Sequence, residues 1–287
     1  MKRRNFIKNT SLTAAALGTG CSARAANKFV PMKLKGNINH SVSRWCFGKF
    51  SLEELISEIK KIGFSAIDLV GPKDWETLKK HGIDSSMCNG AEINLVDGFN
   101  EKKNHDQLVK NYTEMIPLVA KAGYKNLICF SGNRRGMSDE QGLANSVIGL
   151  KKIMGLAEKN GVTIQMELFN TKVNHPDYMC NSTAWGVALC DALGSENFKL
   201  LYDIYHMQIE EGNVIQTIRD YHQYFGHYHT AGVPGRNEIN DTQELNYPAI
   251  AKAVLATGFK GYFAQEFVPT YDNHFDSLAE AIKICDI

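Results

Sequence analysis

Four ionisable side chains close four successive apolar segments in the second half of the chain. They are Glu167, Asp203, His229 and Glu266. A carboxylate in a buried segment loses its hydration, which is costly unless a cation, a partner charge or hydrogen bonds compensate. Three carboxylates and an imidazole brought to one place therefore predict a single divalent-metal site. The alternative is four unrelated polar residues that make structural hydrogen bonds.

The donor set narrows the choice of cation. Carboxylates combined with an imidazole suit a borderline-hard ion with open coordination positions, so we favour Mn²⁺, with Mg²⁺, Co²⁺ or Zn²⁺ as alternatives. The six cysteines after Cys21 form no CxxC pair, which argues against a structural zinc site. A Cys180–Cys190 disulfide is one option for an exported protein, and buried free thiols are the other.

The segments that carry these residues belong to a longer alternating series. Stretches of helical spacing separate eight strand-like segments, which are Asn39–Phe47, Phe64–Val70, Asp84–Ala91, Asn126–Phe130, Val162–Phe169, Lys199–Tyr205, Gly226–Thr230 and Gly261–Val268. The helix candidates include Leu52–Ile62, Leu108–Ala122, Asn145–Asn160, Ala184–Leu193, Val214–Tyr224 and Tyr247–Thr257. Ser51 is a predicted helix cap, and the predicted helix ends are Gly63, Gly123, Gly161 and Gly258.

Eight strand and helix units in about 250 residues predict a (β/α)₈ TIM barrel that spans residues 37–287 as a single domain. An open doubly wound sheet is the alternative, but no glycine-rich phosphate loop follows the first strand. Longer predicted loops follow the third, fifth and seventh strands, at Glu92–His105, Asn170–Ser182 and Ala231–Asn246. A barrel places its active site among the loops at the carboxyl ends of its strands, so the four ionisable groups should meet at one mouth.

The first 25 residues are typical of an export signal. Arg3 and Arg4 are followed by a short apolar run, Leu12–Leu17, and by the small-residue pattern Ala23-Arg24-Ala25. The paired arginines resemble a twin-arginine signal, which would place the protein in the periplasm, with residues 26–36 as an extended lead-in. A Sec signal, an ordinary basic N-terminus and lipoprotein processing at Cys21 are the alternatives.

The charge of the remaining chain argues against a nucleic-acid partner. Beyond residue 25 there are 27 basic and 31 acidic residues, a net charge of −4, with no long basic run. No later apolar stretch is long enough to predict a transmembrane helix. We expect a small-molecule substrate, and for an exported protein a free sugar or sugar derivative more than a phosphorylated one. The oligomeric state is open, a homo-oligomer included.

Several short motifs resemble the hydroxypyruvate isomerase group of the xylose isomerase-like barrels, which have the ketose 3-epimerases as neighbours. The motifs are HSVSRWCF (His40–Phe47), FSGNR (Phe130–Arg134), DIYHMQ (Asp203–Gln208), GHYHTAGVPGR (Gly226–Arg236), ELNYPAI (Glu244–Ile250) and QEF (Gln265–Phe267). The resemblance covers most of residues 37–287 and is specific from Glu167 onward. It implies that Glu167, Asp203, His229 and Glu266 hold the metal and that His206 and Arg236 contact the substrate.

One residue departs from the hydroxypyruvate isomerase pattern. In that group we expect glutamine at the position of His229, whereas the ketose 3-epimerases carry histidine there. The AGVPGR loop and ELNY favour the first group, and His229 favours the second. The resemblance therefore leaves the substrate open.

The predicted parts define a reaction. A substrate with a carbonyl beside a hydroxyl would chelate the cation, which would stabilise the enediolate formed when the adjacent carbon loses its proton. Glu167 and Glu266 are each candidates for metal ligand and proton-transfer base, and the sequence does not rank them. His206 could donate to a substrate oxygen, and Arg236 could bind a carboxylate or phosphate. Weaker candidates for the mouth are Arg44, Trp45, Ser131, Gly132, Asn133, Asn170, Lys172 and His175, with His227 behind the ligands.

Four functions compete. The first is an aldehyde–ketone isomerase of hydroxypyruvate isomerase type, and the second is a ketose 3-epimerase that acts on a free sugar. The third is a non-catalytic sugar-binding barrel. The fourth, a metal-dependent endonuclease, would need more metal ligands and a basic groove, and the sequence offers one ligand set and an acidic body.

Overall fold

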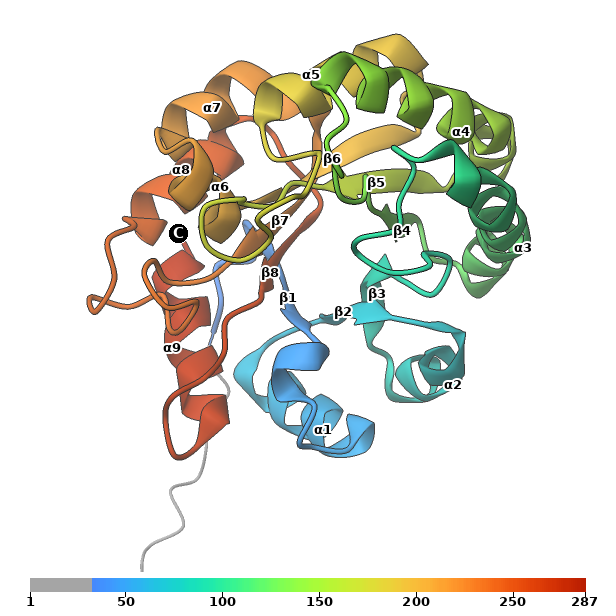
Figure 1. The fold of residues 1–287 in the computed structure, drawn as a ribbon. Helices are drawn as coiled ribbons and strands as arrows, with labels where there is room; N and C mark the ends of the chain where they lie inside the picture. Colours follow the sequence, from blue (N-terminus) through green and yellow to red (C-terminus); the bar gives the residue numbers. More distant parts are fainter. Residues whose placement is uncertain (1–32) are drawn as a thin grey trace, which may run out of the picture. The chain divides into compact units, whose positions relative to one another are not determined.

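The computed structural model describes residues 33–287, so the predicted export signal lies outside the described residues. Eight parallel strands pair in chain order and close into a barrel, in which β1 pairs with both β2 and β8 (Figure 1). The predicted (β/α)₈ architecture is confirmed. The strands are β1 Asn39–Ser43, β2 Ala66–Val70, β3 Asp84–Cys88, β4 Asn126–Cys129, β5 Thr163–Glu167, β6 Phe198–Asp203, β7 Phe225–Thr230 and β8 Tyr262–Gln265.

Helices surround the strands and cover their outer faces (Figure 1). They are α1 Leu52–Ile62, α2 Pro72–His81, α3 His105–Ala122, α4 Asp139–Asn160, α5 Thr183–Leu193, α6 Ile204–Glu210, α7 Val214–Tyr221, α8 Tyr247–Ala256 and α9 His274–Cys285. As predicted, Ser51 caps α1. Its hydroxyl accepts the backbone N–H of Glu54, and the Glu54 carboxylate accepts the backbone N–H of Ser51. Gly123 and Gly161 end α3 and α4 with φ of 83° and 64°, a conformation that favours glycine.

Seven of the eight predicted strand segments are longer than the strands of the structure, and in two of them a helical turn begins where the strand ends. The first ends at Ser43, and Trp45–Phe47 form a 3₁₀ turn instead of continuing the strand. The sixth ends at Asp203, because the Asp203 carboxylate accepts the backbone N–H of His206 at 2.9 Å and so starts α6. The helices α2, α6 and α9 were not among the predicted candidates. Among the described residues, no helix is long and apolar enough to cross a membrane.

Strand register places the predicted ligands on one side of the barrel wall. Asp203 in β6 pairs with His229 in β7, which in turn pairs with Ala264 in β8. Side chains alternate along a strand, so Glu266, two residues beyond Ala264, shares their inward direction. Glu167 ends β5, the strand before β6. All four side chains therefore point into the barrel at its carboxyl end.

The two faces of the barrel wall differ in character. The outward residues Val42 and Ile67 are buried in the apolar layer beneath the helices. Ser41 and Ser43, on the opposite face of β1, and Ser86 in β3 are buried polar residues. Bulky branched side chains usually fill a barrel interior, so small polar groups there leave room for buried ionisable side chains.

Candidate active site and metal centre

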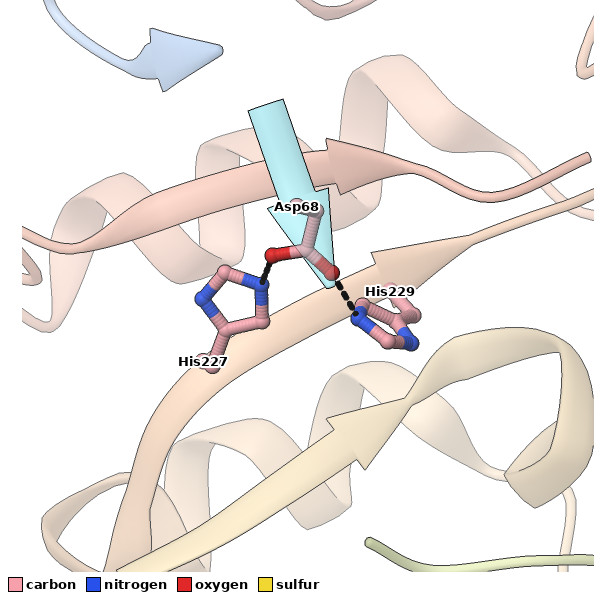
Figure 2. A group of neighbouring side chains, drawn as sticks. All are labelled: Asp68, His227 and His229. Atoms are coloured by element: carbon pink, nitrogen blue, oxygen red, sulfur yellow. Dashed lines mark hydrogen bonds and ion pairs between the residues drawn. The ribbon is translucent and has the colours of Figure 1, made fainter. Parts of the chain in front are cut away.

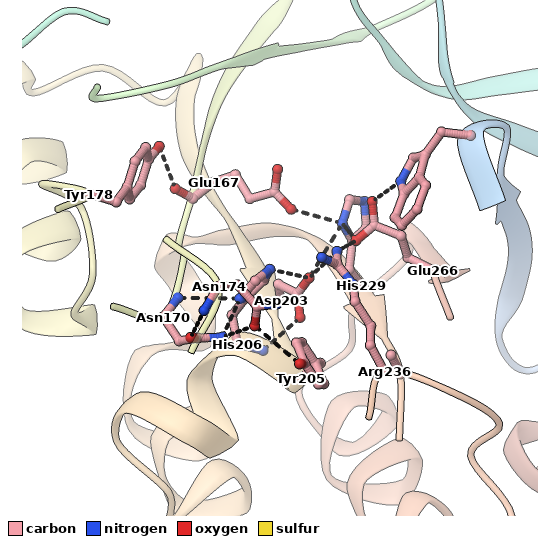
Figure 3. A network of polar contacts seen from close by, with 12 residues as sticks. Glu167, Asn170, Asn174, Tyr178, Asp203, Tyr205, His206, His229, Arg236 and Glu266 are labelled. Carbon is pink, nitrogen blue, oxygen red and sulfur yellow. Dashed lines mark hydrogen bonds and ion pairs between the residues drawn. The ribbon is translucent and has the colours of Figure 1, made fainter. Parts of the chain in front are cut away.

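The four predicted ligands meet around one point. One donor atom from each of Glu167, Asp203, His229 and Glu266 lies within 4.8 Å of the other three, and all four residues are buried (Figure 3). The His229 Nδ1 atom is 3.0 Å from Glu167 Oε1, 2.9 Å from Glu266 Oε2 and 3.9 Å from Asp203 Oδ2. The structure thus brings together the residues that the sequence placed at four strand ends.

Burial and crowding set the charges of these groups. Burial, reinforced by Glu266 and Asp203, raises the pKa of Glu167 to about 8 against the pull of His229. Burial likewise raises the pKa of Asp203 to about 6. Burial also acts on Glu266, but His229 and Arg236 outweigh it and hold the pKa of that carboxyl well below its ordinary value.

The donor set fits a divalent cation. Among the described residues, the cationic partners of the three buried carboxylates are His229 and Arg236, and burial keeps the pKa values of Glu167 and Asp203 raised. A divalent ion would offset this excess of acidic groups, and oxygen donors with one imidazole nitrogen suit Mn²⁺ and related ions. The four predicted ligands are therefore the residues that would hold it.

His206 lies beside this cluster in one defined orientation. Its Nδ1 atom accepts the backbone N–H of Asn170 at 3.3 Å and contacts the Asn170 side chain at 2.6 Å. A neutral imidazole that accepts at Nδ1 carries its proton on Nε2. Burial lowers the pKa of His206 well below its ordinary value, so the ring is neutral. His206 Nε2 lies 3.8 Å from Asp203 Oδ2 and has no hydrogen-bond partner among the described residues.

Arg236 closes the opposite side of the cluster. One of its terminal nitrogens lies 2.6 Å from Glu266 Oε2 and 3.7 Å from Asp203 Oδ2 (Figure 3). The guanidinium also lies over the rings of Trp45 and Tyr205, 5.2 Å and 5.3 Å from their centroids. These contacts fix the guanidinium in place, while its buried Nε has no partner among the described residues.

A cavity of about 330 Å³ opens onto the cluster. Glu167, Glu266, Arg236 and His175 supply its polar lining, and the rest is apolar or aromatic: Trp45, Leu69, Leu95, Phe130 and Phe169. A mostly apolar pocket with a few convergent polar groups is the usual form of a small-molecule site. As predicted, the loops after β3, β5 and β7 contribute to this mouth, through Leu95, His175 and Arg236 respectively.

The weaker candidates divide into cavity and structural residues. Trp45 and His175 line the cavity, and Asn170 orients His206. Arg44 instead bonds the carbonyl oxygens of Phe47 and Phe50, and Lys172 bonds those of Ile209 and Glu210 at the end of α6. Ser131, Gly132 and Asn133 make contacts within and between loops, and the thiols of Cys180 and Cys190 are free.

The sequence reasoning missed one buried acid. Asp68, in the middle of β2, has its Oδ2 atom 2.8 Å from His229 Nε2 (Figure 2). The three carboxylates of the cluster lie nearest the other ring nitrogen, Nδ1. Part of the signal for Asp68 was present in the sequence, because a carboxylate in the apolar run AIDLV needs a compensating partner as the four ligands do, although this residue is in the middle of the run and not at its end.

This fold and this site define the class of protein. Residues 56–285 match the xylose isomerase-like TIM barrel family, and the chain belongs to that family. It is similar to 2-oxo-tetronate isomerase of Cupriavidus necator, with 37% identity over 113 residues, 39% of this chain and 43% of that protein. The chain thus spans less than half the length of that relative.

Two further proteins extend the comparison. Hydroxypyruvate isomerase of Escherichia coli is 25% identical over 237 residues, which cover 78% of this chain and 90% of that protein. The crystal structure of a family 2 AP endonuclease from Brucella melitensis superposes with a TM-score of 0.75 at 20% identity, over 85% of this chain and 98% of the other. At that identity the structural likeness establishes the fold alone.

Proposed function

We propose that this protein is a divalent-metal-dependent isomerase that interconverts the aldehyde and ketone forms of a small hydroxy-carbonyl compound. The convergence of Glu167, Asp203, His229 and Glu266 on one point carries the proposal. The names of the two sequence relatives, a hydroxypyruvate isomerase and a 2-oxo-tetronate isomerase, support the same class. A divalent cation held by these four side chains, for which we favour Mn²⁺, would polarise a substrate carbonyl.

Two unpartnered donors support binding of an oxygen-rich substrate. His206 Nε2 and Arg236 Nε are buried without partners among the described residues, and a buried donor normally requires one. Substrate oxygens would accept both hydrogen bonds. Because a guanidinium suits a carboxylate, Arg236 favours a hydroxy-keto acid over an uncharged sugar. The cavity lies near the small end of the range for ligand pockets, which agrees with a short carbon chain.

Two carboxylates are placed to transfer the proton. Glu167 and Glu266 approach His229 Nδ1 at 3.0 Å and 2.9 Å, so they border the same small space. Isomerisation moves one proton from the hydroxyl-bearing carbon to the neighbouring carbonyl carbon and a second proton between the two oxygens. Either glutamate can take and return the carbon-bound proton, while His206 Nε2 donates to an oxygen.

A ketose 3-epimerase is the second candidate, and His229 is the observation that favours it. The motifs of the loop after β7 resemble the hydroxypyruvate isomerases, but those enzymes are expected to carry glutamine at this position. An epimerase would use the same pair of carboxylates. It would remove a proton from one face of a carbon and return it on the other, and the carbonyl would stay in place.

Proton NMR after incubation in D₂O separates these functions. The protein is depleted of metal, reconstituted with Mn²⁺, incubated with hydroxypyruvate or with free ketoses, and quenched with excess chelator. We expect deuterium at one carbon of hydroxypyruvate and a shift of the carbonyl to the neighbouring carbon. Inversion of a ketose at C3 with the carbonyl unmoved would instead support the epimerase.

Variants test whether the glutamates of the cluster are responsible for the deuterium uptake. Glu167→Gln and Glu266→Gln should each lower deuterium uptake, because each removes a metal ligand, and the variant that also removes the base should lower it by at least 100-fold. Glu238→Gln is the control, because Glu238 is also a buried glutamate but bonds Thr270 and Ser277 instead of residues of the cluster. A metal-loaded protein that binds sugars without deuterium uptake would contradict both enzyme proposals and favour a sugar-binding barrel.

A further inference from the structure

Asp68 is fully buried and its two oxygens have separate partners. Oδ2 lies 2.8 Å from His229 Nε2, whereas Oδ1 accepts the Ser86 hydroxyl at 2.7 Å and lies 2.9 Å from His227 Nε2 (Figure 2). Asp68 is therefore a buried carboxylate with contacts at both of its oxygens.

The backbone around Asp68 is irregular in a way that sets its direction. The register between β2 and β3 shifts on both sides of Asp68, and the next residue, Leu69, has a φ of 56°. A branched residue in this left-handed conformation is strained, and such strain persists where the surrounding structure requires it. Bulges next to active sites commonly redirect a side chain. Here the irregularity accompanies an aspartate that faces His229 from inside the barrel.

The contact with Asp68 determines which nitrogen of His229 is available to a cation. A carboxylate only accepts hydrogen bonds, so the His229 nitrogen that faces it, Nε2, must carry a proton. Nδ1 also faces carboxylates, Glu167 and Glu266, so both ring nitrogens carry protons without a cation. A cation bound among these carboxylates would replace the proton on Nδ1, and the contact with Asp68 would keep the remaining proton on Nε2. A metal-binding histidine commonly donates its other N–H to a carboxylate, which fixes the ring and makes it a stronger ligand.

We infer that Asp68 is a positioning residue that fixes His229 in the tautomer and orientation needed to bind the cation, an inference that rests on the metal site proposed above. His227 and Ser86 hold Asp68 in turn, through its other oxygen. His227 therefore contributes to the site through its contact with Asp68.

This arrangement also accounts for histidine at position 229. A glutamine ligand would bind a cation through its side-chain oxygen, and its amide would have a different length and direction from an imidazole N–H. Asp68 has its oxygen 2.8 Å from the far nitrogen of the ring, a distance that suits a histidine. Asp68 and His229 thus form one functional unit that a glutamine could not simply replace.

Calorimetric titration of the metal-depleted full chain with Mn²⁺ tests the inference without any substrate. Asp68→Ala removes the acceptor, so we expect a Kd for Mn²⁺ about 10- to 100-fold weaker than in the wild type. Asp68→Asn keeps the shape and one acceptor oxygen but loses the charge, so its Kd should lie between the two. Glu238→Gln, the control for a lost buried carboxylate, should bind Mn²⁺ like the wild type.

The outcomes are distinguishable. Wild-type binding of Mn²⁺ together with a Kd for Asp68→Ala within about twofold of it would overturn the role of Asp68 and leave the metal site standing. A wild type that binds no divalent ion would overturn both the site and the inference.

Histidine NMR on the wild type serves if the Asp68 variants do not fold. In protein labelled with ¹⁵N-histidine and loaded with diamagnetic Zn²⁺, His229 should carry its proton on Nε2 and coordinate through Nδ1. Coordination through Nε2 would contradict the inference.

Discussion

The indole N–H of Trp45 donates a hydrogen bond to Glu266 Oε1 across 2.7 Å, although 221 positions separate the two residues in the chain. The bond joins the turn after β1 to the end of β8, where the barrel closes. It occupies one carboxylate oxygen and leaves the other, Oε2, facing His229 and Arg236 at 2.9 Å and 2.6 Å. Trp45 thereby sets the direction in which Glu266 presents its second oxygen.

Trp45→Phe should lower kcat while preserving the fold. The ring that lies beside Arg236 is retained, and only the donor to Glu266 is lost. A hydrogen bond to a charged group contributes about 1.5–3 kcal/mol, so a loss of roughly 10- to 100-fold in kcat is expected. Steady-state kinetics of the proposed isomerisation, with thermal unfolding as the check on folding, measure the effect. A variant with unchanged kcat would mean that Glu266 is oriented by His229 and Arg236 alone.

His206→Phe should reduce kcat/KM by roughly tenfold or more, because it removes the buried Nε2 donor that we assign to a substrate oxygen. The neighbouring variant Tyr205→Phe is the control. It loses only a hydroxyl that bonds Asn174 at 3.1 Å and keeps the ring over which Arg236 lies. If His206→Phe and Tyr205→Phe have the same kcat/KM, His206 does not contribute to substrate binding.

Removal of the metal should lower the free energy of unfolding, because an ion held by the four ligands stabilises the folded protein. At a Mn²⁺ concentration of about 100 times Kd, binding adds about 2.7 kcal/mol to the free energy of unfolding, which raises Tm by roughly 5–10 °C. Chelator should reverse the shift, and Asp203→Asn should greatly reduce it. Differential scanning fluorimetry with and without Mn²⁺ measures both. A Tm that responds to Mn²⁺ equally in Asp203→Asn would place the ion elsewhere.

The sequence predicted the barrel and the ligand set because both follow from local patterns. Each ligand stands late in an apolar segment, and parallel strands bring such positions to one mouth. Where pairing of strands matters, local patterns are insufficient. Trp45 was predicted to be in strand one and to wall the pocket, yet its bond to Glu266 depends on closure of β1 against β8, which no local pattern encodes.

Asp68 was missed for a different reason. The motif resemblance is specific from Glu167 onward and does not reach β2, and no residue near Asp68 in the sequence indicates its partner. Its partners, His227 and His229, lie on β7, across the barrel interior. Only the closed barrel reveals that a residue in the second strand supports a ligand in the seventh.

His40 should make folding stability depend on pH. It lies in β1, buried beside the Phe64 ring, with neither ring nitrogen partnered among the described residues. Burial lowers the pKa of His40 from 6.5 to about 4, despite an opposing effect of Asp286. Between those two values the unfolded chain binds a proton that the folded protein does not, so stability rises with pH there. The contribution is fully present above pH 6.5 and is lost as pH falls towards about 4.

Replacement of this imidazole by a neutral ring tests the effect. The wild type should lose about 3 kcal/mol of unfolding free energy through His40 over that pH window, given 1.36 kcal/mol for each pKa unit. His40→Phe keeps an aromatic ring against Phe64 and cannot take up the proton, so its stability should fall less steeply with acid. Urea unfolding at pH 4.5, 5.5, 6.5 and 7.5 gives the two slopes. Parallel slopes for wild type and variant would show that the His40 ring is protonated equally in the folded and unfolded states.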